Sequence, residues 1–265
     1  MIERDTSPQR RLADQWILVT RPAEQAERLS QLIEAEGGQV LRFPTVEIGD
    51  PKEPSAVEEI IRRLDRFHWA VFVSANAVKR GLPWVLSRRE MPADLKIAVV
   101  GQATAQALAD FGLHPHLCPT SGYNSEALLA MDELQHMSGS RVVIFRGSGG
   151  RELLAGTLAK RGAQIEYAEV YRRCLPPPSV AAKLRQTLAS RPVDVVITTS
   201  KAVLENLCYL VGEPLLEKLR LIPLVVIGSR QAQQAKELGF TQIWVAQEPS
   251  DTALVQAIIE HEDKL

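Results

Sequence analysis

The sequence has almost no net charge and few cysteines. Lysine and arginine number 31 and aspartate and glutamate 32, so the formal charge is −1. This balance argues against general binding to nucleic acids or anionic membrane surfaces, although a local basic cleft is compatible with it. The three cysteines, Cys118, Cys174 and Cys208, lie far apart without a CxxC spacing. They fit a reducing compartment in which buried thiols are ordinary core residues.

Long apolar runs are also missing. The longest, residues 97–100 and 222–227, are far shorter than the roughly 20 residues that cross a bilayer. Residues 1–15 are polar and charged and lack the apolar core of a signal peptide. We therefore expect a soluble, cytoplasmic protein.

The common cofactor and nucleophile motifs are absent as well. GSGGRE (147–152) has Glu152 where the dinucleotide motif GxGxxG has its last glycine, and no P-loop or GxSxG motif occurs. His114 and His116 could contact a metal, but without carboxylates or cysteines at ligand spacing a surface loop is favoured. The sequence predicts no cofactor and no metal, and it disfavours a nucleotide-binding Rossmann enzyme.

What the sequence does contain is an internal repeat. Residues 16–40 match 141–165, residues 69–78 match 194–203, and residues 96–108 match 223–235, each pair at an offset near 125. Three matches in the same order indicate a duplication. A length of 265 residues is also enough for two domains of ordinary size.

Apolar runs alternate with amphipathic stretches throughout both repeats. Residues 70–73, 142–145, 195–197 and 225–227 are rich in β-branched residues without polar alternation, as in strands buried on both faces. Stretches such as 26–37 have helical periodicity, and glycine follows several of them. This predicts an α/β protein with two flavodoxin-like, doubly wound parallel-sheet domains.

Two proline-rich stretches occupy equivalent places in the repeats, after the second strand of each. If both connect domains, the chain crosses between domains twice. We then expect one discontinuous domain of residues 1–42 and 176–265, a second domain of residues 55–167, and connectors at 43–54 and 168–175. The alternative is two sequential domains divided near residue 138, where the SGS stretch (138–140) is short.

Small and hydroxylic residues follow the predicted strands at six junctions, where open parallel sheets bind ligands. Free backbone N–H groups and the positive helix end make each junction a candidate anion site, although Ser and Thr there are more often simple N-caps. The nearby cations, Arg146 among them, suggest a ligand with several carboxylates or phosphates. The candidate binding residues are Arg21, Ser74, Asn76, Gly101, Gln102, Thr104, Gly147, Arg151, Thr199, Ser200, Lys201, Ser229 and Arg230.

Eight motifs follow one another along the chain. They are VTRP (19–22), GGQVLRFPTVEI (37–48), VFVSANAV (71–78), VVGQATAQAL (99–108), RGSGGRELL (146–154), EVYRR (169–173), ITTSKAVLENL (197–207) and VIGSRQA (226–232). In their order and spacing they resemble the uroporphyrinogen-III synthase family, and the resemblance extends from about residue 17 to 259.

The resemblance implies an enzyme that takes hydroxymethylbilane, removes its hydroxyl as water and closes the macrocycle with inversion of ring D. The product, uroporphyrinogen III, is a precursor of haem and other tetrapyrroles, and no cofactor is used. The implied fold is two α/β domains joined by a two-stranded connector, with the polycarboxylate substrate between them. A monomer is expected, with a possible transient contact with the preceding enzyme of the pathway.

The resemblance also implies a catalytic residue. Tyr171 stands where the family has a tyrosine proposed to help the hydroxyl leave as water; the alternative is a tyrosine that only packs between domains. The sequence departs from the family at residues 228–232, where Gln231 replaces a threonine, whereas Thr104 in the earlier repeat is kept. A different class of function, a non-enzymatic anion-binding or sensory module on the same fold, stays open.

Overall fold

The computed structural model describes residues 10–262 of the chain. The chain folds into two compact units. Unit 1 comprises Met1–Glu47 and Cys174–Leu265, and unit 2 comprises Ile48–Arg173. The two boundaries fall inside the segments 43–54 and 168–175 that the sequence suggests as connectors. Residues 1–9 and 263–265, which the expected discontinuous domain includes, lie outside the described residues.

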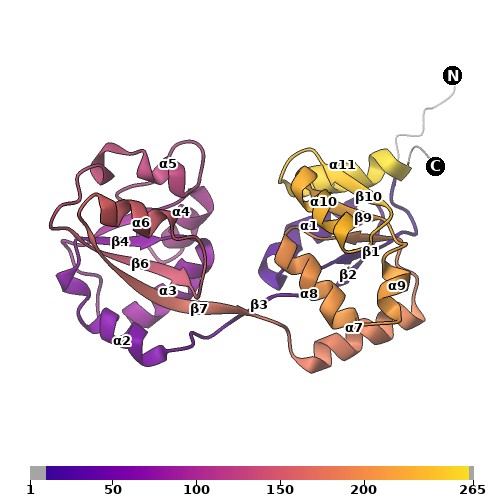
Figure 1. The fold of residues 1–265 in the computed structure, drawn as a ribbon, viewed down its shortest axis with the longest axis horizontal. Coiled ribbons are helices and arrows are strands. Elements are labelled where there is room, and N and C mark those ends of the chain that lie inside the picture. Colours follow the sequence, from indigo (N-terminus) through magenta and orange to yellow (C-terminus); the bar gives the residue numbers. More distant parts are fainter. Residues whose placement is uncertain (1–9, 263–265) are drawn as a thin grey trace, which may run out of the picture. The chain divides into compact units, whose positions relative to one another are not determined.

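Unit 1 is a five-stranded sheet with helices on both of its faces (Figure 1). Its strands lie in the order β10-β9-β8-β1-β2, and all neighbours pair in parallel. Its elements are β1 (Trp16–Val19), α1 (Ala23–Ala35), β2 (Gln39–Arg42), α7 (Pro178–Ser190), β8 (Val195–Ile197), α8 (Lys201–Val211), α9 (Leu215–Leu219), β9 (Leu224–Ile227), α10 (Gly228–Glu237), β10 (Ile243–Ala246) and α11 (Asp251–Glu262).

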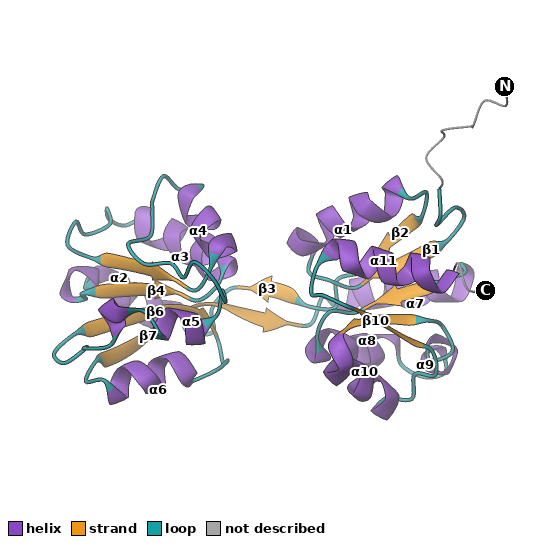
Figure 2. Ribbon diagram, turned by 90° about the horizontal axis from the view of Figure 1, so that it is seen from above, coloured by secondary structure: helices purple, strands orange, loops and turns teal. Residues whose placement is uncertain are grey.

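Unit 2 contains a second five-stranded sheet, in the order β3-β7-β6-β4-β5, again with helices on both faces (Figure 2). Strands β7, β6, β4 and β5 pair in parallel. The elements assigned to this sheet and its helices are β3 (Glu47–Gly49), α2 (Pro54–Arg62), a 3₁₀ turn (Leu64–Arg66), β4 (Trp69–Phe72), α3 (Ala75–Leu86), β5 (Lys96–Val99), α4 (Gln102–Ala109), α5 (Ser125–Leu129), a second 3₁₀ turn (Asp132–Leu134), β6 (Arg141–Gly147), α6 (Leu153–Lys160) and β7 (Gln164–Cys174).

Each central strand contributes to two cores, which explains its uninterrupted apolar sequence. Ile17 and Val19 of β1 pack with α1 and α11, whereas Leu18 between them packs with α7 and α8. In unit 2, Phe72 of β4 stacks on Phe145 of β6 with ring centroids 4.5 Å apart. Successive side chains of a strand point to opposite faces, so a strand covered by helices on both sides needs apolar residues at every position.

The four strand predictions at 70–73, 142–145, 195–197 and 225–227 are confirmed by β4, β6, β8 and β9. The glycines that were expected to follow helices also do so: Gly37 and Gly162, at equivalent places after α1 and α6, have φ of 90° and 93°. This left-handed conformation suits glycine, because a Cβ would clash there. The structure adds strands β3 and β10, which the repeat did not predict.

No helix in the described range, residues 10–262, is long and apolar enough to cross a membrane.

Candidate functional site

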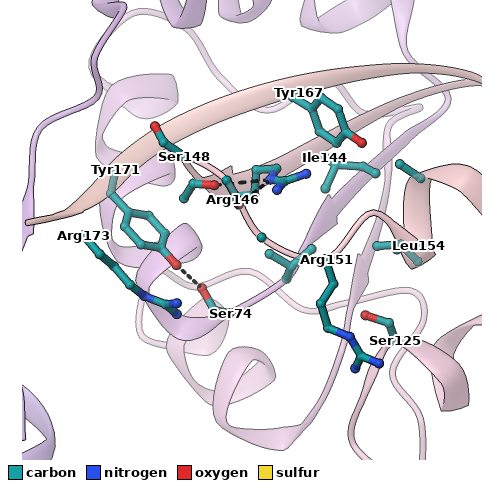
Figure 3. A pocket seen from close by; sticks show the side chains of 15 residues that line it. Ser74, Ser125, Ile144, Arg146, Ser148, Arg151, Leu154, Tyr167, Tyr171 and Arg173 are labelled. Atoms are coloured by element: carbon teal, nitrogen blue, oxygen red, sulfur yellow. Dashed lines mark hydrogen bonds between the residues drawn. The ribbon is translucent and has the colours of Figure 1, made fainter. Parts of the chain in front are cut away.

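A pocket of about 340 Å³ lies in unit 2, where β4 and β6 end (Figure 3). Ser74 is the second residue after β4, and the glycine-rich segment 147–150 begins at the last residue of β6. Ligands of open parallel sheets bind at this edge, because helices begin there and present free N–H groups. The fifteen residues that line the pocket are Val73, Ser74, Ser125, Ile144, Arg146, Gly147, Ser148, Gly149, Gly150, Arg151, Leu154, Ala155, Tyr167, Tyr171 and Arg173.

Tyr171 of β7 is held at several points. Its ring lies so close to Gly147 that a Cβ on that glycine would come within 2.5 Å of the ring. Its carbonyl oxygen accepts a hydrogen bond of 2.8 Å from the Ser148 N–H. Its hydroxyl lies 3.3 Å from Ser74 Oγ, and Figure 3 shows it directed at that side chain. The residue is only 3% exposed, so the ring has a fixed position beside the pocket.

Ser74 also caps helix α3. Its Oγ accepts a hydrogen bond of 3.1 Å from the Ala77 N–H, which satisfies one of the free donors of the first turn. The helix therefore fixes the position of the side chain that contacts Tyr171.

The segment 147–150 is held by Arg146. The Nε of this buried arginine donates to the carbonyl oxygens of Gly147 and Gly149, both at 3.2 Å, and its Nη1 lies 3.0 Å from Glu152 Oε1. Its guanidinium also stacks on the Tyr167 ring, 4.6 Å from the centroid. Gly149 N–H in turn donates to Glu169. Arg146, a candidate cation for the ligand, is thus already engaged by the protein's own groups.

Tyr167 completes this network through its hydroxyl, which donates a hydrogen bond to Glu152. Burial, followed by this hydrogen bond, raises the pKa of Tyr167. The hydrogen bonds from Tyr167 and Arg146 lower the pKa of Glu152 below its usual range. At neutral pH Tyr167 is therefore a stable donor and Glu152 a stable ionised acceptor, which keeps the wall of the pocket in one arrangement.

Two further arginines line the pocket. Arg151 is exposed and pairs with Glu126 at 2.9 Å. Arg173, two residues after Tyr171 in β7, is also exposed, and within residues 10–262 it has no ion pair with a carboxylate. Figure 3 shows it beside the Tyr171 hydroxyl. Arg173 is therefore available to an anionic ligand without breaking a salt bridge.

Of the candidate binding and catalytic residues, the structure brings four together in the pocket: Ser74, Gly147, Arg151 and Tyr171. Arg146, which the sequence suggests as a nearby cation, also lines it. Four more belong to unit 2 but do not line it. Asn76 lies in the first turn of α3, Gly101 and Gln102 begin α4, and Thr104 is 4% exposed within α4.

The remaining six, Arg21, Thr199, Ser200, Lys201, Ser229 and Arg230, lie in unit 1 after β1, β8 and β9. Arg21 is paired with Asp251, and Lys201 lies 3.4 Å from Glu205. Ser200 caps α8 through the Val203 N–H. Gln231, where the family resemblance implies a threonine, accepts a hydrogen bond of 2.9 Å from the Ile227 N–H and so supports the start of α10.

Sequence reasoning missed Ser125, Ser148, Tyr167 and Arg173 as lining residues. The strand period of two could have found Arg173, because it lies two residues after Tyr171 in the same strand. It could not have found Tyr167, because the register of β7 shifts between Tyr167 and Tyr171, and the two side chains pack in different cores. Ser125 and Ser148 carry no such signal.

Over residues 10–262, no group of three or more His, Cys, Asp or Glu side chains could hold a metal ion. His116 is engaged otherwise, because its Nδ1 accepts a hydrogen bond of 3.0 Å from the Ile97 N–H.

Comparison with known proteins gives consistent results. The family model described as uroporphyrinogen-III synthase HemD matches residues 27–256. The uroporphyrinogen-III synthase of Escherichia coli K12 is 32% identical to this chain, and the match covers 91% of this chain and 99% of the relative. The uroporphyrinogen-III synthase of Salmonella typhimurium LT2 is 31% identical, with the same two coverages. Among solved structures, a mutant uroporphyrinogen III synthase from the extreme thermophile Thermus thermophilus matches with a TM-score of 0.61 and 19% identity, covering 95% of this chain and all of that one.

Proposed function

The chain belongs to the uroporphyrinogen-III synthase family, and on this basis we propose that it closes hydroxymethylbilane to uroporphyrinogen III with Tyr171 as the group that assists loss of water. The chain is thus an enzyme of tetrapyrrole biosynthesis. The family model covers residues 27–256, and the relatives match over nearly their full length. The observation that carries the catalytic assignment is the buried Tyr171, fixed at the pocket with its hydroxyl beside Ser74.

The chemistry needs a proton donor and a folded substrate. The bond between the hydroxymethyl carbon and its oxygen breaks, and the oxygen takes the Tyr171 proton and leaves as water. The substituted carbon of ring D then attacks the resulting azafulvene, and rearrangement through a spiro intermediate inverts the ring. The last ring closure releases a proton from carbon, which restores the tyrosine. The phenolic O–H of a tyrosine is a hydrogen-bond donor, and a positioned side chain of this kind can act as a general acid.

Selection of the type III product is proposed to come from positioning. Attack without inversion gives the type I isomer, so the protein must hold the chain of pyrroles in the conformation that leads to the spiro intermediate. Carboxylates of the substrate would be bound by N–H groups at helix starts and by arginines such as Arg173. The candidate binding residues of both units remain proposals in this role.

The strand orders support the proposed duplication. By the repeat, β1 and β2 correspond to β6 and β7, and β8 and β9 correspond to β4 and β5. Unit 1 has the order β2-β1-β8-β9 and unit 2 the order β7-β6-β4-β5, so equivalent strands take equivalent places. We propose two flavodoxin-like domains, each with two strands from one repeat and two from the other. This arrangement supports a discontinuous domain of 1–42 and 176–265, a domain of 55–167, and connectors at 43–54 and 168–175.

The proposed state is a monomer without a cofactor. Contact with the preceding enzyme of the pathway stays a prediction. The relatives that match over most of this chain are named as synthases. Their names favour the enzyme over the non-enzymatic anion-binding module.

The first test is the product. Purified protein treated with a chelator and given freshly made hydroxymethylbilane is expected to form mainly the type III isomer, because the family resemblance implies a reaction without a metal or cofactor. Chromatography that separates the two isomers provides the measurement, with an enzyme-free reaction as control. Product no richer in type III than this control would contradict the proposed function.

The second test concerns Arg173. Arg173→Ala is expected to raise KM about tenfold, because one charge-assisted hydrogen bond to a substrate carboxylate is worth roughly 1.5–3 kcal/mol before solvent weakens it. The matched control is Arg172→Ala, which removes the same charge from the neighbouring exposed position outside the pocket. Steady-state kinetics in which both variants raise KM equally would indicate general attraction by positive charge and would remove Arg173 from the binding site.

A further inference from the structure

The hydrogen bonds of Ser74 define which way its hydroxyl proton can point. A serine hydroxyl has one proton to donate and two acceptor sites. One acceptor site takes the Ala77 N–H at 3.1 Å, and Tyr171 Oη lies 3.3 Å away. Either hydroxyl could donate in this second contact. The direction matters, because it decides whether the Tyr171 proton points to Ser74 or into the pocket.

We propose that Ser74 is a positioning residue that donates its proton to Tyr171 Oη and thereby leaves the tyrosine proton free for the substrate's hydroxyl. This inference rests on the proposed function of Tyr171 and assigns Ser74 a role different from carboxylate binding. The Ala77 N–H polarises the Ser74 hydroxyl, and a hydroxyl that accepts one hydrogen bond becomes a better donor in the next. The positive end of helix α3 acts in the same direction.

The surroundings of Tyr171 hold its ring and backbone in place, so that mainly the direction of its O–H bond can still change. Gly147 packs against the ring, and the Ser148 N–H holds the backbone. Ser74 is the side chain that the Tyr171 hydroxyl meets in the described part of the chain. With the ring fixed, a donor at Ser74 directs the phenolic proton to the pocket, whereas an acceptor at Ser74 draws it away.

Two nearly isosteric variants separate these possibilities. Asn and Asp cap helices about as well as Ser, so both Ser74→Asn and Ser74→Asp keep α3. The amide of Asn can still donate to Tyr171 Oη, whereas an ionised Asp can only accept. We expect Ser74→Asn to lose about threefold in kcat and Ser74→Asp to lose on the order of 30-fold, within the range that positioned proton transfer supplies. The readout is kcat at saturating substrate, with thermal melting to confirm folding.

The same pair in the Tyr171→Phe background is the decisive comparison. Without the phenolic hydroxyl, the kcat difference between Asn and Asp should disappear, because the two residues act through Tyr171. The control is the pair Ser250→Asn and Ser250→Asp, at the serine whose Oγ accepts from the Ala253 N–H at the start of α11. That pair should differ by less than twofold.

Equal kcat for Ser74→Asn and Ser74→Asp, with Tyr171→Phe still slow, would overturn this inference alone and leave Ser74 as a helix cap. Equal increases in KM with wild-type kcat would also overturn it, since they would indicate a substrate contact. A Tyr171→Phe enzyme as fast as wild type would overturn both the role of Tyr171 and this inference. The type III product, measured separately, tests the proposed function itself.

Discussion

Tyr171→Phe slows turnover on the order of 10²-fold, the low end of what one positioned proton donor contributes. The change removes a single oxygen and leaves the ring against Gly147, so the packing stays as it is. Loss of the contact with Ser74 costs the stability of about one hydrogen bond, roughly 0.5–1.5 kcal/mol. For a protein of this size that lowers Tm by only a few degrees. Single-turnover kinetics and thermal melting measure the two effects separately.

The control for this variant is Tyr209→Phe, which removes a phenolic oxygen from a side chain that is 73% exposed in unit 1. It should turn over like wild type. Thr104→Ala and Ser200→Ala should cost less than Tyr171→Phe, because backbone N–H groups at those helix starts would still bind carboxylates. Tyr171→Phe could instead turn over as fast as wild type while Thr104→Ala or Ser200→Ala lost most of its turnover. Catalysis would then depend on anion binding, and Tyr171 would only be a packing residue.

Gly147→Ala should impair both folding and catalysis. The new Cβ would come within 2.5 Å of Tyr171 Cε2 and 2.6 Å of Cζ, far inside van der Waals contact. The ring is buried and cannot swing into solvent, so strand β6, β7 or the ring must shift. Overpacking of this kind costs about 1–3 kcal/mol. A displacement near 1 Å at a reacting group can cost on the order of 10²-fold in rate. We expect a lower Tm together with a turnover close to that of Tyr171→Phe.

Gly156→Ala provides the matched control, because a Cβ there has no heavy atom within 4 Å and the residue lies inside helix α6. Alanine is favoured over glycine in a helix by roughly 0.8–1 kcal/mol, so this variant should melt slightly higher and turn over normally. A Gly147→Ala enzyme with wild-type kcat would mean that the exact place of the Tyr171 ring does not matter to the reaction.

The fold was readable from the sequence where each strand had both faces covered. The runs at 70–73 and 195–197 are apolar at consecutive positions, and the structure buries them in β4 and β8 between two layers of helices. The repeat at an offset near 125 likewise placed equivalent helix ends at Gly37 and Gly162. Strands β3 and β10 were missed, because Glu47–Gly49 is too short to carry a period, and Ile243–Ala246 lies outside the matched segments.

The site was readable only in part. Ser74, Gly147, Arg151 and Tyr171 were suggested by strand ends and by family resemblance, and they line one pocket. The role of Arg146 in holding the segment 147–150 could not be predicted from the sequence. Its partners Glu152, Tyr167 and Glu169 come from a loop and a strand that pack against it only in the folded chain. Arg173 was missed for a related reason: that no carboxylate among residues 10–262 pairs with it is a property of the tertiary arrangement.

The sequence by itself determined the α/β class, the repeat, the positions of the central strands and the family, because local periodicity and motif order are properties of the chain. The tertiary structure decided which strands share a sheet: β1 and β2 lie in one sheet with β8 and β9 rather than with β4 and β5. It also decided the partner of each polar group at the pocket. Pairing and hydrogen bonding between residues 74 and 171 depend on distances in space, and those follow only once the strands have taken their places.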